Sequence, residues 1–176
     1  MRLFPAYVLS LAIALGGCGG HAFYPSRAIE GRVVDVETGQ ALAGAAVVAK
    51  WDWGGPGLGH PTEGIHDAVE VVTDADGNFT LPRKMHVRLY GEVEPPFIIV
   101  YYPGYKDFHG QEGSGLFAAK NSEPAQIALR KLGPGERMKG ADTPTLVDGI
   151  PKSKIPNLLR LVNVQRKALG LEPIRR

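Results

Sequence analysis

The sequence predicts an all-β protein, a sandwich of about seven short strands, followed by one C-terminal helix. Three observations lead to this fold class. Apolar and polar residues alternate over short stretches between residues 29 and 130, which is the period of a strand with one buried face. The chain has 23 glycines and 14 prolines, which favours frequent turns over long helices. Apolar residues recur at helical spacing near the C-terminal end, over residues 153–170.

The expected strands follow one another at short intervals. Residues 97–102 form a continuous apolar run, which is typical of a strand buried on both faces. Asp76-Gly77 predicts a tight hairpin turn, because both residue types tolerate positive φ. Residues 54–66 contain five glycines and two prolines, so we expect a loop there. The strand ranges are 29–36, 44–53, 67–73, 79–81, 85–90, 97–102 and 126–130.

The first residues have the pattern of an export signal. Arg2 precedes an apolar run, Leu3 to Leu15, that is shorter than the roughly 20 residues a transmembrane helix needs. Cys18, the only cysteine, follows Leu15-Gly16-Gly17, and this segment resembles the bacterial lipobox. The resemblance implies cleavage before Cys18 and lipidation of that residue by a diacylglyceryl group and an acyl chain such as palmitate, which together anchor stably. Gly19 after the cysteine implies the outer membrane.

These features divide the chain into five parts. We expect a lipoprotein signal peptide at 1–17, a flexible tether at 18–27 and a β-sandwich at 28–132. Residues 133–152, rich in glycine, proline and charge, are expected to be a linker or a wrapping arm. Residues 153–170 form the amphipathic helix, with Ser153 as a candidate N-cap and Gly170 as a candidate end.

Three motifs in order resemble the carboxypeptidase regulatory-like domain, a transthyretin-like sandwich. The resemblance covers about residues 29–132 and implies a non-catalytic, scaffolding module. The motifs are Gly31-Arg32-Val33-Val34-Asp35 with Thr38-Gly39, Leu42, Gly44-Ala45 and Val47; Thr73-Asp74-Ala75-Asp76-Gly77-Asn78-Phe79-Thr80-Leu81; and Gly104-Tyr105.

Catalytic motifs are missing from the sequence. It has no His-Glu-x-x-His pair and no phosphate-binding glycine loop. Gly113-Ser114-Gly115 fails the spacing of a nucleophile elbow, because Glu112 and Leu116 occupy the positions that need glycine. We therefore expect no enzymatic activity, no metal and no cofactor. A formal net charge of +2, spread along a chain of mixed charges, does not predict nucleic-acid binding.

Candidate binding residues are Trp51, Trp53, His60 and His66. The alternation places both tryptophans on one face, where they serve either as core residues or as a platform for a sugar. His60 and His66 lie in or beside the glycine-rich stretch and suggest ligand binding, with a metal-dependent hydrolase as the least favoured reading. The basic C-terminal helix either docks on the sandwich or meets a partner protein or an anionic surface.

The sequence thus predicts a membrane-anchored lipoprotein of the bacterial envelope, facing the periplasm or the cell surface. Its sandwich would serve scaffolding, assembly or binding of an envelope protein. The alternative is a carbohydrate- or ligand-binding module that uses Trp51, Trp53 and the Gly54–His66 stretch. An assembly role like that of the transthyretin-like lipoprotein of type VI secretion is a related reading by architecture alone.

Overall fold

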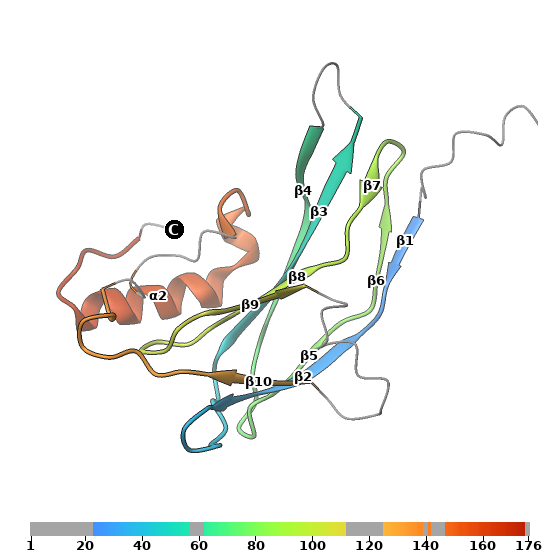
Figure 1. Cartoon of the computed structure of the whole chain (residues 1–176). Helices are drawn as coiled ribbons and strands as arrows, with labels where there is room; N and C mark the ends of the chain where they lie inside the picture. Colours follow the sequence, from blue (N-terminus) through green and yellow to red (C-terminus); the bar gives the residue numbers. More distant parts are fainter. Residues whose placement is uncertain (1–22, 57–61, 112–124, 139–140, 142–146, 175–176) are drawn as a thin grey trace, which may run out of the picture.

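The computed structural model describes residues 23–56, 62–111, 125–138, 141 and 147–174. Figure 1 shows β-strands at the centre and one side, with a single α-helix on the opposite side. The elements in chain order are β1 (Phe23–Ser26), β2 (Ile29–Asp35), β3 (Ala46–Gly55), β4 (Thr62–Val72), β5 (Asn78–Leu81), β6 (Lys84–Val87), β7 (Glu92–Val93), β8 (Phe97–Tyr101), β9 (Phe108–Gln111), β10 (Ala125–Leu129), the 3-10 helix η3 (Lys152–Lys154) and α2 (Pro156–Ala168).

The strands form two stacked sheets and a separate ribbon. One sheet has the order β10-β2-β5, in which β10 runs parallel to β2 and β5 antiparallel to it. The larger sheet has the antiparallel order β4-β3-β8-β9, and β7 pairs with the far end of β3. Strands β1 and β6 form the ribbon, a two-stranded antiparallel sheet. The predicted all-β sandwich with a C-terminal helix is confirmed.

The larger sheet is buried on both faces, so the domain has two cores. Val47, Ala49, Trp51, Ile98 and Val100 pack against the residues of the smaller sheet. The alternate positions pack against α2, and Leu158 and Val162 are the fully buried residues of that helix. The expectation that the apolar run at 97–102 is buried on both faces is confirmed over β8. On the sheet side, the second core consists of Ala46, Val48, Ala68, Ile99 and Tyr101.

Helix α2 is docked on the sheet rather than free. Its N-terminus is capped from the sheet, because the carboxylate of Glu70 on β4 accepts hydrogen bonds from the backbone N–H groups of Asn157 (2.8 Å) and Leu158 (2.6 Å). These are backbone donors that the helix itself cannot satisfy. The expected cap, Ser153, instead lies in η3, and no side chain of the N-cap residue Ile155 caps the helix. Gly170 follows the helix with a φ of +71°, as expected.

Two predicted ranges are wrong, and for a third the structure favours one of the two expected roles. The expected tether at 18–27 contains β1, which starts at Phe23 and pairs with β6. The expected loop at 54–66 is largely strand, because β3 continues to Gly55 and β4 begins at Thr62. Residues 133–152 are not a simple linker: Val147 and Ile150 are buried in the second core, so this part acts as the wrapping arm.

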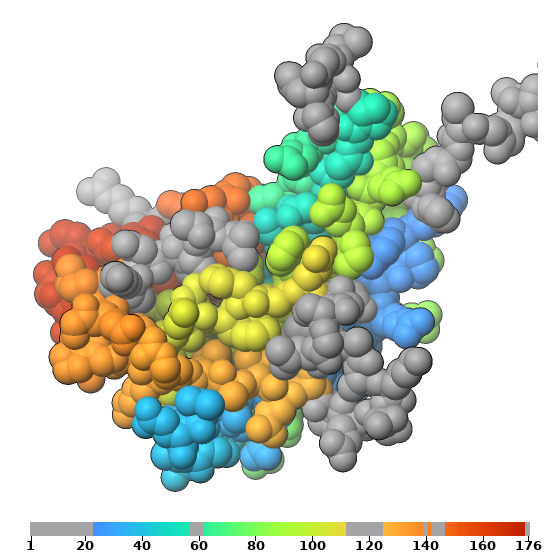
Figure 2. Space-filling view, viewed as in Figure 1, coloured from blue at the N-terminus to red at the C-terminus, as the bar shows by residue number. Residues whose placement is uncertain are grey.

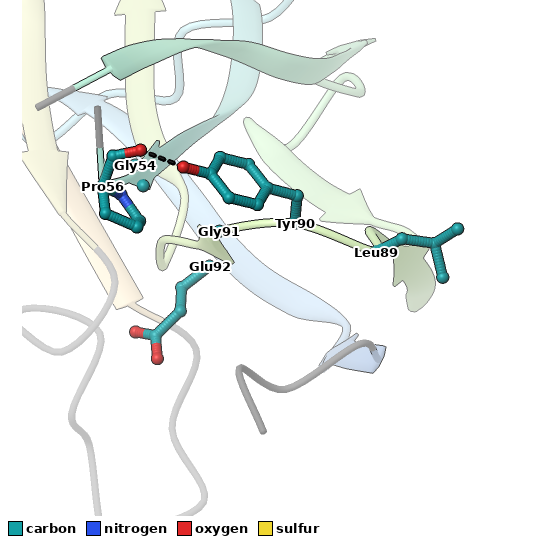
Figure 3. A pocket seen from close by; sticks show the side chains of 7 residues that line it. Gly54, Pro56, Leu89, Tyr90, Gly91 and Glu92 are labelled. Carbon is teal, nitrogen blue, oxygen red and sulfur yellow. Dashed lines mark hydrogen bonds between the residues drawn. The ribbon is translucent and has the colours of Figure 1, made fainter. Parts of the chain in front are cut away.

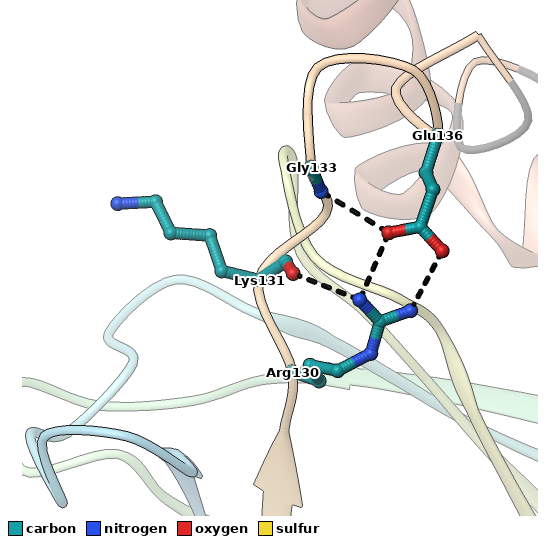
Figure 4. Close-up of polar contacts among 4 residues, drawn as sticks. All are labelled: Arg130, Lys131, Gly133 and Glu136. Atoms are coloured by element: carbon teal, nitrogen blue, oxygen red, sulfur yellow. Dashed lines mark hydrogen bonds and ion pairs between the residues drawn. The ribbon is translucent and has the colours of Figure 1, made fainter.

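An ion pair fixes the start of the wrapping arm. Figure 4 shows the guanidinium of Arg130, directly after β10, paired with both carboxylate oxygens of Glu136 at 2.9 and 3.0 Å. Glu136 also accepts a hydrogen bond from the backbone N–H of Gly133, which closes the turn. The chain is thereby directed from the smaller sheet toward α2.

Candidate functional site

The predicted site residues lie where β3 and β4 extend beyond the sandwich. Trp51 on β3 is buried, with 1% of its surface exposed, and belongs to the first core. Trp53, two residues further along β3, is half-buried. His66 lies on β4, while His60 lies outside the described residues. The structure therefore brings Trp51, Trp53 and His66 into one region but gives them different environments.

A β-bulge places His66. Trp51 pairs with Asp67, but the next residue of β3, Asp52, pairs with Ile65, so His66 is the additional residue on β4. Its ring meets the ring of His86 edge-on, with the centroids 5.2 Å apart. His86 also contacts Trp51 at 4.6 Å and Tyr24 at 6.0 Å. We call these four residues, Tyr24, Trp51, His66 and His86, the histidine cluster.

The histidine cluster joins the ribbon to the larger sheet. Only 2% of the surface of His86 is exposed. Burial lowers the pKa of His86, and the nearby His66 lowers it further. Burial and the charge of Arg88 likewise lower the pKa of His66. Both imidazoles are therefore neutral at pH 7, and they act as packing groups between β1, β3, β4 and β6.

Three buried polar atoms around this cluster have no hydrogen-bond partner among the described residues. They are Oγ of Ser26, Nε1 of Trp51 and Nε2 of His86. Sequence reasoning named Trp51 and His66 but missed Tyr24 and His86. The available signal was the alternation over 85–90, which places His86 on the face opposite Met85 and Val87.

Asp67, beside the bulge, connects three elements. Its carboxylate accepts hydrogen bonds from the ammonium groups of Lys84 on β6 and Lys154 in η3. Burial alone would raise the pKa of Asp67, but the contacts with Lys154 and Lys84 outweigh that effect and lower the pKa to about 2. Asp67 is consequently an ionised structural anchor for the ribbon and for the start of α2.

Trp53 does not present an open ring to solvent. The guanidinium of Arg88 lies over the ring, 3.4 Å from its centroid. The ring also lies against Gly64 on β4, where a Cβ atom would come within 2.8 Å of Nε1 of Trp53. Because Trp51 is buried and Arg88 covers Trp53, the two tryptophans do not form the exposed stacking platform that a sugar site would use.

Two pockets flank this region. Figure 3 shows the larger one, about 530 Å³, where the hydroxyl of Tyr90 donates a hydrogen bond to the carbonyl of Pro56 and the side chain of Leu89 points the other way. Glycines and apolar groups dominate its lining, and Glu92 supplies a carboxylate. A second pocket of about 350 Å³ contains the Lys50–Asp52 ion pair, 2.8 Å long, and half-buried Trp53. The larger pocket is lined by Gly54, Gly55, Pro56, Leu89, Tyr90, Gly91 and Glu92.

The described residues do not assemble a metal centre. Nowhere among them do three His, Cys, Asp or Glu side chains come close enough to hold an ion. His66 and His86 alone would supply two ligands, fewer than the three protein ligands of a catalytic zinc. Within the same residues, no helix has the length and apolar character needed to cross a membrane.

Comparisons with known proteins leave the family open. No family model matches the chain, and no curated protein matches it. Among solved structures, a streptococcal ancillary pilin aligns with 61% of this chain at 18% sequence identity and a TM-score of 0.34. The aligned part spans 30% of the pilin chain, less than a third of its length. The fold class therefore rests on the strands and cores described above, which make this chain a β-sandwich with a docked C-terminal helix.

Proposed function

We propose that this chain is a non-catalytic lipoprotein of the bacterial envelope, anchored through lipid on Cys18, whose β-sandwich binds or scaffolds an envelope protein. The observation that carries the proposal is the position of the only cysteine. Cys18 follows Leu15-Gly16-Gly17 at the end of an apolar leader and precedes the first described strand by five residues. The first described strand thus starts only a few residues after the cysteine that the lipobox pattern would modify.

The perturbed titratable groups support a non-catalytic role. In an enzyme, shifted pKa values gather in an accessible cleft. Here each described shift has a structural cause: burial of His66, His86 and Tyr101, ion pairing of Asp67 and of Arg130, and the contact between Tyr105 and Asp35. None of these groups lines either pocket beside Trp53.

The far side of the domain is available to a protein partner. Helix α2 buries its apolar face on the sheet and leaves basic side chains exposed, among them Arg160 and Lys167. In Figure 1 the helix lies on the opposite side of the molecule from β1, the first described strand after Cys18. An anchor at β1 would therefore present α2 away from the membrane, toward other envelope proteins.

Membrane fractionation of a Cys18→Ser variant tests the anchor. The native host would express the full chain and the variant at matched levels, and membranes would be washed at high salt to remove peripheral protein. We expect the full chain to remain in the membrane fraction and the variant to leave it, because a thioether-linked diacylglyceryl group needs the thiol. Equal distribution of the two proteins would overturn the proposal.

A further inference from the structure

The ribbon formed by β1 and β6 has an inverted distribution of polarity. Tyr24 pairs with His86 and Ser26 pairs with Lys84 on the inner face, which packs on the larger sheet. Phe23 pairs with Val87 and Pro25 pairs with Met85 on the alternate positions. Since successive side chains of a strand point to opposite faces, these apolar residues share the outer face.

The outer face is exposed to an unusual degree. The exposed fractions are 64% for Phe23, 60% for Met85, 52% for Val87 and 95% for Leu89. The register makes neighbours of Phe23 and Val87 and of Pro25 and Met85, and Leu89 follows two residues after β6. Exposed apolar residues grouped in this way mark a surface that contacts a partner or a membrane. We call this surface the ribbon patch; it consists of Phe23, Pro25, Met85, Val87 and Leu89.

The position of the ribbon patch indicates what covers it. Phe23, a member of the patch, is five residues after Cys18. A chain of that length spans at most about 18 Å even when fully extended. A lipid anchor on Cys18 would thus keep Phe23 within about 18 Å of the lipidated residue, whereas α2 lies on the other side of the molecule, as Figure 2 also shows.

Positive charge at one end of the ribbon also favours a membrane as the surface that the ribbon contacts. Arg27 follows β1 and Arg83 precedes β6, directly beyond the Ser26–Lys84 pair, and both are exposed. Their guanidinium groups suit the anionic head groups of a bilayer. One acidic residue, Glu92, lines a small pocket together with β1.

We infer that the ribbon patch lies on the membrane, with Phe23, Met85, Val87 and Leu89 inserted at the level of the lipid head groups. This inference rests on the proposed lipid anchor at Cys18 and adds the orientation of the domain to it. The membrane contact then explains why apolar side chains are placed outside and His86 inside. It fixes one edge of the sandwich on the bilayer and leaves α2 facing away.

Depth-dependent quenching in vesicles tests the orientation. The full-length protein, carrying Val87→Cys and the environment-sensitive fluorophore NBD at that position, would be reconstituted into vesicles of phosphatidylethanolamine and phosphatidylglycerol. Lipidated Cys18 has no free thiol, so the label is specific. The matched control is Val36→Cys, which has a similar exposed fraction (54% against 52%) but follows β2 at another part of the molecule. Intact mass of each protein reports the lipid on Cys18.

We expect a blue shift and strong quenching by doxyl-labelled lipid for NBD at 87, with neither at 36. Equal behaviour of the two positions in a protein that carries lipid would overturn the orientation and leave the anchor standing. Disulfide-linked dimers of the unlabelled Val87→Cys protein, together with no lipid quenching of the labelled protein, would mean that a second copy covers the patch, which also overturns the orientation. A protein without lipid mass would refute the proposed function and the orientation together.

Discussion

The hydroxyl of Tyr105 donates a hydrogen bond of 2.7 Å to the carboxylate of Asp35, although the two residues are far apart in the sequence. Asp35 ends β2 and also accepts hydrogen bonds from the backbone N–H groups of Glu37 and Thr38 in the following turn. The bond from Tyr105, together with those N–H groups, lowers the pKa of Asp35. Burial and the contact with Asp35 raise the pKa of Tyr105 to about 12.

This bond links the first and third of the sequence motifs, and a threonine links the first and second. The hydroxyl of Thr73 donates to the carbonyl of Leu42 (2.6 Å) and accepts from the backbone N–H of Ala45 (2.9 Å). Asp74, the next residue, accepts from the N–H groups of Asp76 and Asn78 and thereby closes the turn from β4 to β5. The predicted hairpin is wrong here, because these two strands belong to different sheets and do not pair with each other. The motif residues therefore hold the turns of the sandwich together.

Tyr105→Phe should lower the thermal unfolding midpoint, because Asp35 loses a donor to its ionised form. Asp35 has a lowered folded-state pKa, so its contribution to stability is present at neutral pH and is lost as the pH falls below its unfolded value. The difference in thermal unfolding midpoint between the unsubstituted protein and Tyr105→Phe should thus be largest near pH 7 and should become smaller in acid. Tyr102→Phe is the control, since Tyr102 lies 5.5 Å from Tyr105 between ring centroids but does not bond Asp35. An equal loss in both variants would contradict the role of the bond.

Glu70→Ala should destabilise the domain by about 1 to 2 kcal/mol, the usual cost of losing a helix N-cap. The backbone N–H groups of Asn157 and Leu158 would lose their acceptor at the start of α2. Urea unfolding followed by circular dichroism would measure the change. Glu63→Ala, an exposed position on the same strand, is the matched control. A Glu70→Ala protein as stable as this control would show that the cap contributes nothing.

Stability should fall in mild acid because of the histidine cluster. The folded-state pKa of His86 and that of His66 lie below the ordinary value of 6.5, so the unfolded chain binds more protons in that range. Stability is therefore complete above about pH 6.5 and decreases as the pH falls below it. Asp67, whose pKa is lowered to about 2, adds a second loss below about pH 4.

The variant His86→Phe separates these contributions. It removes the buried titrating imidazole and should flatten the pH dependence of the urea midpoint between pH 5 and 7, a window set by the ordinary histidine pKa. His109→Gln serves as control, because His109 is partly exposed and pairs with Asp107 at 2.9 Å outside the cluster. The attribution of the pH dependence to His86 would be refuted if the urea midpoint still changed with pH in His86→Phe but no longer did so in His109→Gln.

Arg88→Ala should make Trp53 more accessible to solvent, because the guanidinium that lies over its ring is removed. Acrylamide quenching of tryptophan fluorescence would measure this in a Trp51→Phe background, where Trp53 is the remaining tryptophan. We expect increased quenching. The same substitution in a Trp53→Phe background should change nothing, since Trp51 is buried in the core. Quenching that is unchanged in the first background would mean that Arg88 does not shield the ring.

The alternation of residues predicted most strands but not which face is inside. Over 85–90 it separates Met85 and Val87 from His86 correctly, yet the polar His86 is buried and the apolar residues are exposed. Hydrophobicity alone favours the opposite arrangement. The choice depends on Trp51 and Tyr24, which surround His86 from distant parts of the sequence.

The glycine-rich stretch 54–66 shows why composition alone assigned a loop to residues that lie in β3 and β4. Gly54 and Gly55 lie in β3, where β4 and β7 pair on either side of Gly54. Gly64 is required in β4 because any Cβ there would collide with Trp53. Gly64 thus serves close approach rather than flexibility, whereas a single-sequence rule assigns the whole stretch to a loop. The cap of α2 was likewise unpredictable, because Glu70 precedes Asn157 by 87 residues.

The intact mass of the native protein tests the central claim most directly. The full chain would be extracted from membranes of the native host and compared with the Cys18→Ser variant. We predict that the native protein begins at Cys18 and carries the added mass of a diacylglyceryl group, with or without a third acyl chain, and that the variant carries no lipid mass. A native protein that carries an unmodified thiol at Cys18 would contradict the account.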